Sequence, residues 1–140
     1  MIKEIKISDY QRLVEIWESA VSNTHYFLKE EDFVYYKKQL PVYFQHVALI
    51  GFEQNNILIG FAGVAEGNLE MLFVHNDYRG TGIGKRLIEY TISDLQVTKV
   101  DVNEQNTQAV DFYKHIGFIV LQRSELDGEG KEYPILHMQL

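Results

Sequence analysis

A glycine-rich segment flanked by cations carries the clearest chemical signal in the chain. Residues 79–86 read Arg-Gly-Thr-Gly-Ile-Gly-Lys-Arg, with glycine at positions 80, 82 and 84. Glycine has no Cβ atom, so a bulky anion can approach this main chain closely. Ile83, Leu87 and Tyr90 follow at helical spacing, which places the segment at the start of a helix. The free N–H groups and the positive dipole end of such a terminus bind phosphate well.

The spacing excludes two common kinds of phosphate loop. A Walker A loop needs glycine where Arg79 stands, and Ser or Thr where Arg86 stands. A dinucleotide fingerprint needs its third glycine where Lys85 stands. What remains is Arg-x-x-Gly-x-Gly, preceded by the apolar run 69–74. The simplest alternative is a glycine-rich turn with solvated charges.

Two motifs in this order resemble a known family. The order apolar strand, Arg-x-x-Gly-x-Gly and helix resembles the acyl-coenzyme A site of the GNAT superfamily of N-acetyltransferases. Residues 106–118 resemble that family's second signature, Asn-x-x-Ala-x-x-Phe-Tyr-x-x-x-Gly-Phe. The resemblance is strongest over residues 69–118. It implies the GNAT fold, acetyl-coenzyme A as co-substrate, and transfer of the acetyl group to a primary amine.

The resemblance also implies which residues hold the acetyl-coenzyme A. In the family, the fourth and fifth strands splay apart and the pantetheine arm lies between them; here these strands would be Leu69–Val74 and Lys99–Val102. Splayed strands leave N–H and C=O groups unpaired, and the amides of the arm can pair with them. The expected cofactor-binding residues are Leu72, Phe73, Val74, Arg79, Gly80, Thr81, Gly82, Ile83, Gly84, Lys85 and Asn106.

Two residues are the candidate catalytic groups. Tyr113 occupies the family's Phe-Tyr position, and its phenol, with a reference pKa of about 10, can protonate the departing thiolate. It also lies in the apolar stripe of its helix, so a role only in the core is the alternative. Glu70 is expected to share a strand face with Leu72 and Val74 and to act as the base; the alternative is a solvated edge charge. His75 is a second candidate base.

The acceptor side is expected at an aromatic segment between the first two helices. His25 and Phe27 are the candidate substrate-contacting residues, although a lone histidine is more often structural than catalytic. The remaining histidines show no spacing of metal ligands, so no metal is expected. No cysteine and no Gly-x-Ser-x-Gly pattern is present, so direct attack by the amine within a ternary complex is the simpler mechanism. A backbone N–H near Phe73 or Val74 is a possible oxyanion donor by family likeness.

Composition limits the class of protein. The chain has 140 residues, no cysteine and a formal net charge of −7. We expect one domain over residues 1–140, located in the cytoplasm, as a monomer or homodimer. The acidic balance argues against a nucleic-acid partner, and no apolar run is long enough to span a membrane. The acidic protein must therefore bind a polyanion through local donors, and Arg79, Lys85 and Arg86 form its tight basic cluster.

Periodicity predicts an α/β fold with a mixed sheet and helices on both faces. The first helix is expected to begin at a capping box of Ser8 and Gln11 and to run to about Val21. A second helical segment covers 30–44, with Pro41 expected to end or kink it. The predicted order is β-α-α-β-β-β-α-β-α-β-β.

Two functional hypotheses remain open at this point. The first is an N-acetyltransferase acting on a small-molecule or peptide amine. The second is a module that senses acyl-coenzyme A and catalyses nothing. Glu70 and Tyr113 favour catalysis, because a sensor needs neither. The identity of the acceptor amine is not encoded in any motif, since acceptor pockets are built from variable loops.

Overall fold

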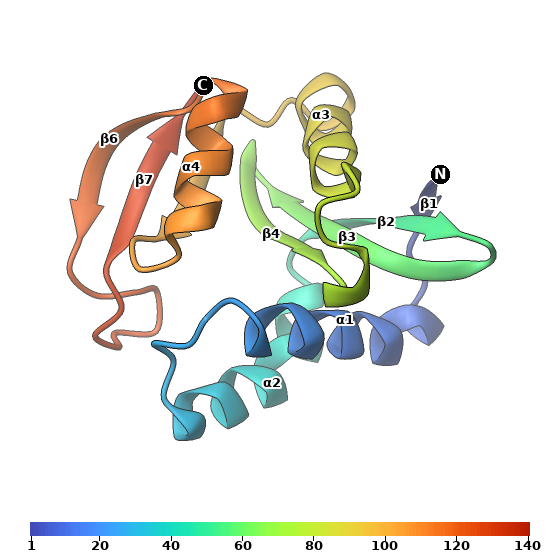
Figure 1. The fold of residues 1–140 in the computed structure, drawn as a ribbon, viewed down its shortest axis with the longest axis horizontal. Helices are drawn as coiled ribbons and strands as arrows, with labels where there is room; N and C mark the ends of the chain where they lie inside the picture. The colour runs from blue at the N-terminus through green and yellow to red at the C-terminus, as the bar shows by residue number, and fades with distance from the viewer.

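The computed structural model describes residues 1–140 and contains one seven-stranded sheet with four α-helices (Figure 1). The sheet order is β1-β2-β3-β4-β5-β7-β6. The strands are β1 (Ile2–Glu4), β2 (Ala48–Gln54), β3 (Ile57–Ala65), β4 (Asn68–Val74), β5 (Lys99–Asn103), β6 (Ile119–Ser124) and β7 (Ile135–Gln139). The helices are α1 (Tyr10–Ser22), α2 (Glu30–Phe44), α3 (Ile83–Leu95) and α4 (Thr107–Ile116), with short 3-10 helices η1 (Ile7–Asp9) and η2 (Asn76–Tyr78). The predicted order of strands and α-helices is confirmed.

Helices cover both faces of the sheet, as the pattern predicted. The core around Phe61 joins α1 and α2 to one face, and the core around Leu87 joins α3 and α4 to the other. Strand β3 is buried on both faces, with seven successive buried residues from Leu58 to Val64. This explains why its sequence is a continuous apolar run instead of an alternating one.

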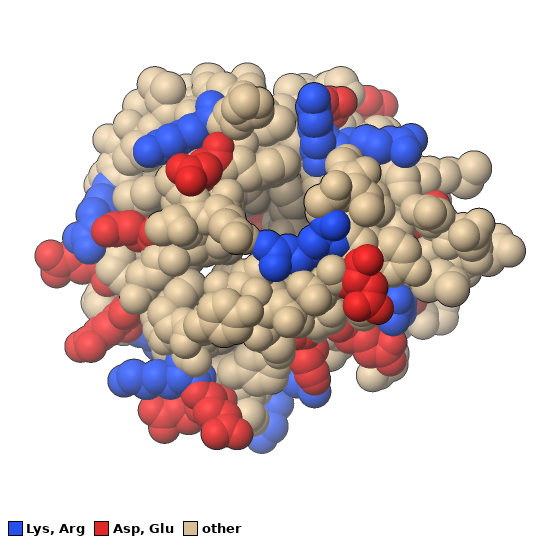
Figure 2. Space-filling model, viewed as in Figure 1, with Lys and Arg blue, Asp and Glu red and all other residues tan.

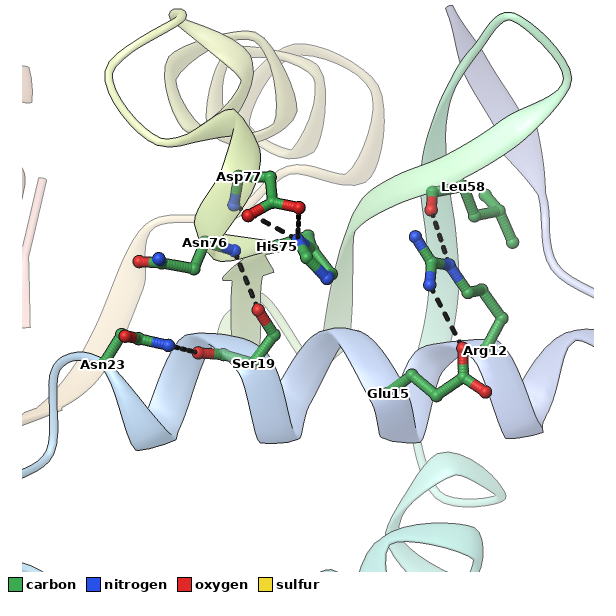
Figure 3. Close-up of polar contacts among 8 residues, drawn as sticks. All are labelled: Arg12, Glu15, Ser19, Asn23, Leu58, His75, Asn76 and Asp77. Atoms are coloured by element: carbon green, nitrogen blue, oxygen red, sulfur yellow. Dashed lines mark hydrogen bonds and ion pairs between the residues drawn. The ribbon is translucent and has the colours of Figure 1, made fainter.

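Helix α1 is held at two points, to strand β3 and to the 3-10 helix η2 (Figure 3). Near its start, Arg12 Nε donates to the main-chain oxygen of Leu58 on β3 over 2.9 Å. Near its end, Ser19 Oγ accepts from the N–H of Asn76, at 3.0 Å. Asn76 lies in η2, directly after β4. These contacts place the C-terminal end of α1 beside the segment that leads into the glycine-rich loop.

Strands β4 and β5 pair over only two residue pairs and then separate. The parallel pairs are Asn68 with Lys99 and Leu69 with Val100. Beyond Leu69, β4 continues for five residues with no β5 partner. The predicted splay is therefore present. It opens a gap in the sheet that is bordered by β4, β5 and α4.

A β-bulge at Glu70 changes the faces along β4. Gly63 pairs with Met71 and Val64 pairs with Leu69, so Glu70 has no partner on β3. As a result, Leu69 packs into the core under α3 and α4, while Met71 packs into the core under α1 and α2. Simple alternation would have put these two residues on one face. The expectation that Glu70 continues the Leu72–Val74 face fails for this reason.

The predicted start of α1 is wrong, and of the two outcomes predicted at Pro41 the end of the helix does not occur. Helix α1 begins after Asp9, not at a Ser8 capping box, and the Asp9 carboxylate accepts from the Lys6 N–H at 2.9 Å. Helix α2 continues past Pro41 to Phe44, so the proline does not end it. Its last turn is held by buried Phe44, which packs at 90° to the ring of Phe61.

No helix of the protein combines the length and the apolar character that a membrane crossing requires.

Candidate active site

A cavity of about 340 Å³ lies beside the glycine-rich segment and is here called the glycine-loop cavity. It lies among the end of β4, the start of α3 and the helix α4. Figure 2 shows a hollow near the middle of this face, with a basic side chain along its edge. The predicted residues that line it are Leu72, Phe73, Val74, Arg79, Gly80, Gly82, Ile83, Gly84, Lys85, Asn106, Tyr113 and His25.

The glycines leave the main chain open on this side. Gly80 and Gly82 have φ angles of 75° and 85°, which favour glycine, and no atom lies within 4 Å of where their Cβ atoms would stand. A Cβ on Gly84 would only reach ordinary contact, 3.9 Å from Phe112 and Val74. The spaces beside these three positions are therefore free for a ligand.

The N-terminus of α3 provides unpaired donors at the same place. Gly82 is its N-cap residue, and no side chain caps the helix. The first helical hydrogen bond runs from the Arg86 N–H to the Gly82 oxygen, at 3.1 Å. The N–H groups of the preceding first-turn residues consequently remain available. Free donors, a positive dipole end and bare main chain together fit a diphosphate.

The basic cluster is less compact than predicted. The Arg79 guanidinium donates to Gln108 Oε1 on α4, so it spans from the loop to that helix. Lys85 lines the cavity and lies 3.9 Å from Glu89. The Arg86 guanidinium instead stacks over the ring of Phe52, 4.8 Å from its centre, away from the cavity. Only Arg79 and Lys85 of the three expected cations therefore line the glycine-loop cavity.

Thr81 does not line the cavity, contrary to the expectation from the motif. Its side chain is turned back, and its hydroxyl donates to the main-chain oxygen of Tyr78 at 2.5 Å. The only hydroxyl in the motif is therefore used in a hydrogen bond within the loop. Tyr78 itself does line the cavity, together with Gln108 and Phe112. Sequence reasoning missed these three; only Phe112 lay at a fixed position of the second motif.

Asn106 is the N-cap of α4, as its sequence position predicted. Its Oδ1 accepts from the Ala109 N–H at 3.3 Å. The residue also borders both the glycine-loop cavity and the gap between β4 and β5. Capping thus fixes the side chain at the edge of the site, while its contact with a cofactor remains a prediction.

Tyr113 points from α4 into the region where β4 and β5 separate. It lines the glycine-loop cavity and the smaller cavity of about 110 Å³ between the two strands, here called the β4–β5 cleft. Only 7% of the residue is exposed. Burial alone raises the pKa of its phenol above the ordinary value, with no hydrogen bond contributing. The hydroxyl is therefore protonated across the physiological range and free to donate.

A second cavity of about 230 Å³ lies on the α1/α2 side of the sheet and is here called the aromatic cavity. Its lining includes the predicted residues Phe27, His25 and Glu70. Glu70 and Asp127 supply the two carboxylates among otherwise mostly apolar and aromatic residues. Glu70 is exposed toward this space and has no hydrogen-bond or ion-pair partner within the chain. A pocket of this kind suits an amine on an aliphatic stem.

Residues 125–134, between β6 and β7, close the aromatic cavity by hydrogen bonding to α2. The Tyr36 hydroxyl donates to Asp127, and the Tyr133 hydroxyl donates to Asp32. The Tyr43 hydroxyl donates to Glu129 at 2.6 Å. These hydrogen bonds join residues about ninety to a hundred positions apart in the chain. No local motif could have identified them.

His25 borders both cavities and the β4–β5 cleft, as Phe73 also does. Thr24 Oγ1 donates its one proton to the Ala20 oxygen at 2.8 Å, so His25 Nδ1 must donate to Thr24 Oγ1 at 2.7 Å. The remaining ring nitrogen, Nε2, then carries a lone pair. Burial lowers the pKa of His25 to about 4, so the ring is neutral at physiological pH. Nε2 can accept a hydrogen bond, but it is a weak base.

His75 is not at the site, which corrects its role as second candidate base. Its Nδ1 accepts from the Asp77 N–H at 3.2 Å and caps η2 (Figure 3). It lines none of the three spaces described above. No group of three His, Cys, Asp or Glu side chains is placed to hold a metal ion.

Comparison with known proteins identifies the family. A family model described as an acetyltransferase (GNAT) domain matches residues 18–140. Peptidyl-lysine N-acetyltransferase YjaB of Salmonella typhimurium is 34% identical over 138 residues, covering 98% of this chain and 95% of that protein. The solution structure of apo-form YjaB from Escherichia coli is also 34% identical, with a TM-score of 0.91 over 99% of this chain and 95% of that one. PaiA N-acetyltransferase from Thermoplasma acidophilum, solved with coenzyme A, has a TM-score of 0.71 at 22% identity, covering 100% and 98%.

The chain belongs to the GNAT family of acetyltransferases. It is an N-acetyltransferase that uses acetyl-coenzyme A as the acetyl donor. The family resemblance, the fold class and the co-substrate inferred from the two motifs are thereby confirmed. The glycine-loop cavity and the splayed strands of this chain fit that co-substrate, because they provide free N–H donors and open main chain along one continuous path.

The partly buried, neutral ring of His25 predicts a pH-dependent stability. Its pKa is about 4 in the folded chain against an ordinary value of 6.5, so the unfolded chain binds more protons between these values. Stability should therefore fall as the pH drops from 6.5 toward 4, by about 3 kcal/mol from this residue. Urea unfolding at a series of pH values measures this loss. His25→Gln should flatten the curve in that window, and an unchanged slope would contradict the burial argument.

The open main chain at Gly84 predicts that a substitution there can weaken coenzyme A binding without destabilising the fold. In Gly84→Ala the methyl group meets no close atom and helix propensity improves, so stability should stay the same or rise by up to about 1 kcal/mol. Coenzyme A affinity should nevertheless fall at least several-fold, because the methyl group enters the ligand's space. Calorimetric titration with coenzyme A measures the affinity. Gly128→Ala, also in open space but far along the chain, is the control; equal affinity in both variants would refute this placement of the diphosphate.

Proposed function

We propose that the protein acetylates the ε-amino group of lysine side chains in peptides or proteins. The observation that carries this proposal is the aromatic cavity, which joins the β4–β5 cleft at His25, Glu70 and Phe73. Its aromatic walls suit the aliphatic stem of lysine, and Glu70 and Asp127 suit the ammonium. The name of the 34% identical relatives, peptidyl-lysine N-acetyltransferase, supports the same acceptor.

Acetyl-coenzyme A, the acetyl donor, enters from the side of the glycine-loop cavity, opposite the aromatic cavity. We place the diphosphate on the free N–H groups at the start of α3, and the pantetheine arm along β4. The His75 N–H donates to the Ile59 oxygen, which extends the β3–β4 pairing by one residue pair. Hydrogen-bonded pairs alternate along an antiparallel ladder, so the main-chain groups of residues 73 and 71 also face β3. Those of Leu72 and Val74 then face the gap. Their unpaired N–H and C=O groups are the partners available to the amides of the arm.

The same alternation selects the oxyanion donor. Of the two candidates from the sequence, the Phe73 N–H faces β3 and the Val74 N–H faces the gap. We therefore assign the Val74 N–H to the thioester oxygen. Negative charge develops on this oxygen as the amine attacks, and a fixed donor stabilises that charge.

Different residues carry out the two proton transfers: Glu70 on the amine side of the cleft and Tyr113 on the thiolate side. The ammonium must lose a proton before its nitrogen can attack, and Glu70 takes that proton directly or through water. The neutral nitrogen bonds to the acetyl carbon, the C–S bond breaks, and the thiolate accepts a proton from the Tyr113 hydroxyl. The second proton lost by the nitrogen passes through water to the Tyr113 phenolate, and Glu70 releases the first proton to solvent. The lone pair of His25 Nε2 orients the amine N–H without taking its proton. No covalent acyl-enzyme intermediate is needed.

A non-catalytic sensor of acyl-coenzyme A is the alternative function. Such a module would need the glycine-loop cavity alone. The second cavity on the other face, with a carboxylate of Glu70 free toward it, has no purpose in a sensor. Acetyltransferase relatives covering almost the whole chain also favour catalysis.

An acceptor panel tests the proposal. A lysine peptide, the same peptide with blocked lysine, a peptide with only a free N-terminus, and spermidine are incubated with acetyl-coenzyme A, and products are identified by mass spectrometry. Acetylation should occur on the lysine Nε and be lost when that amine is blocked. Turnover of spermidine or the N-terminus alone would replace lysine as the acceptor, and coenzyme A binding with no turnover would support the sensor.

Tyr113→Phe should separate chemistry from binding. Loss of the hydroxyl removes the proton donor for the thiolate, so kcat should fall roughly 100-fold. Coenzyme A affinity should change little, because the ring still fills the same space. Steady-state kinetics and calorimetric titration on the same preparation measure the two quantities. A parallel loss of affinity would show that Tyr113 packs against the donor without taking part in the reaction.

A further inference from the structure

A serine, a histidine and an aspartate on three neighbouring strands form a hydrogen-bonded chain that no step of the proposed acetyl transfer uses. Its aspartate, Asp101, also borders the β4–β5 cleft, whereas Ser124 and His137 do not. Ser124 Oγ on β6 lies 2.6 Å from His137 Nε2 on β7. His137 Nδ1 lies 2.7 Å from Asp101 Oδ1 on β5. Asp101 and His137 are directly opposite each other in the ladder. The sequence contains no serine motif, so only the fold brings these three residues together.

The hydrogen bonds fix the direction of proton transfer. A carboxylate only accepts, so His137 Nδ1 must carry the proton that is donated to Asp101. In the neutral ring, Nε2 is then unprotonated and accepts from the Ser124 hydroxyl. Asp101 makes no other ion pair and is held by this bond alone. Ser124, His137 and Asp101 thus correspond to a serine nucleophile, its general base and the group that orients the base.

An amide side chain lies where an oxyanion donor is needed. Gln122 pairs with His137 across the β6–β7 ladder and is two residues from Ser124, so both β6 side chains share the face of His137. Gln122 is exposed and makes no side-chain hydrogen bond within the chain. Its carboxamide N–H groups are consequently free to donate to a carbonyl oxygen bound at Ser124.

The group is reachable by solvent and adjoins the aromatic cavity. The side chains of His137 and Asp101 are 36% and 46% exposed. Ser124 pairs with Ile135, which lines the aromatic cavity, on the sheet face away from α4. Ser124 is two strands from β5, at a spacing of about 5 Å per strand, so it does not border the cleft assigned to the thioester. Its chemistry is therefore separate from acetyl transfer to the amine.

We propose that Ser124 is a nucleophilic serine that reacts with small activated acyl esters. Ser124 Oγ forms a bond to the acyl carbon while its proton moves to His137 Nε2. The ester C–O bond then breaks, and the leaving alcohol receives that proton. Water attacks the acyl-Ser124 ester, gives its proton to Nε2, and Ser124 Oγ regains it as the acid is released. The result is an esterase activity that needs neither coenzyme A nor Tyr113.

The test uses 4-nitrophenyl acetate with the full-length protein and no coenzyme A. Release of 4-nitrophenolate is followed by absorbance, and the Ser124 peptide is searched for a hydroxylamine-labile acetyl group. Ser124→Ala should reduce both signals to the background, while acetylation of a lysine peptide from acetyl-coenzyme A stays unchanged. Ser93→Ala is the matched control, because Ser93 on α3 is bonded to Asp94 and Tyr90 and has no histidine partner.

Variants of the other two residues distinguish chemistry from surface hydrogen bonding. His137→Ala should lose the activity and regain part of it when imidazole is added, which a merely structural role would not allow. Asp101→Asn should lower the rate about ten-fold or more at unchanged melting temperature, because it disturbs the ring orientation that Asp101 provides. Absence of an acetyl ester on Ser124, equal rates in Ser124→Ala and Ser93→Ala, or failure of imidazole rescue would each overturn the proposal.

Discussion

The brevity of the β4–β5 pairing is the constraint on which the rest of the site depends. Two parallel residue pairs hold the sheet together at one end, and beyond them β4 presents main-chain groups that no strand satisfies. Burying such groups without partners is costly, so a cleft of this kind is stable only where water or a ligand can pair with it. Both cavities and the cleft meet at this opening, and His25 borders all three.

Much of the fold followed from local patterns, because these patterns are set by near neighbours in the chain. The apolar run of β3, the helix that follows the glycines and the Asn106 cap each depend on a few adjacent residues. Most of the lining of the glycine-loop cavity could be predicted for the same reason, because much of it belongs to one continuous segment, 72–85, with a fixed order of glycines.

The acceptor side could not be predicted in the same way. Tyr36 and Asp127 meet across ninety-one positions of sequence, and neither stands in a motif. The Ser124–His137–Asp101 chain is likewise assembled by strand order, since β7 lies between β5 and β6 in the sheet but after both in the sequence. Arg86 shows that a local pattern can also mislead. Its place beside two other cations suggested phosphate binding, whereas its side chain stacks on the ring of Phe52, away from the cavity.

The unpaired residue in β4 also makes the length of this strand critical. Leu69 belongs to the core on one side of the sheet and Met71 to the core on the other, and Glu70 between them absorbs the change of face. Removing one residue here would restore regular alternation and would turn either the first half or the second half of the strand inside out. An insertion or deletion of a single residue here would therefore disrupt both hydrophobic cores and displace the Glu70 carboxylate at the same time.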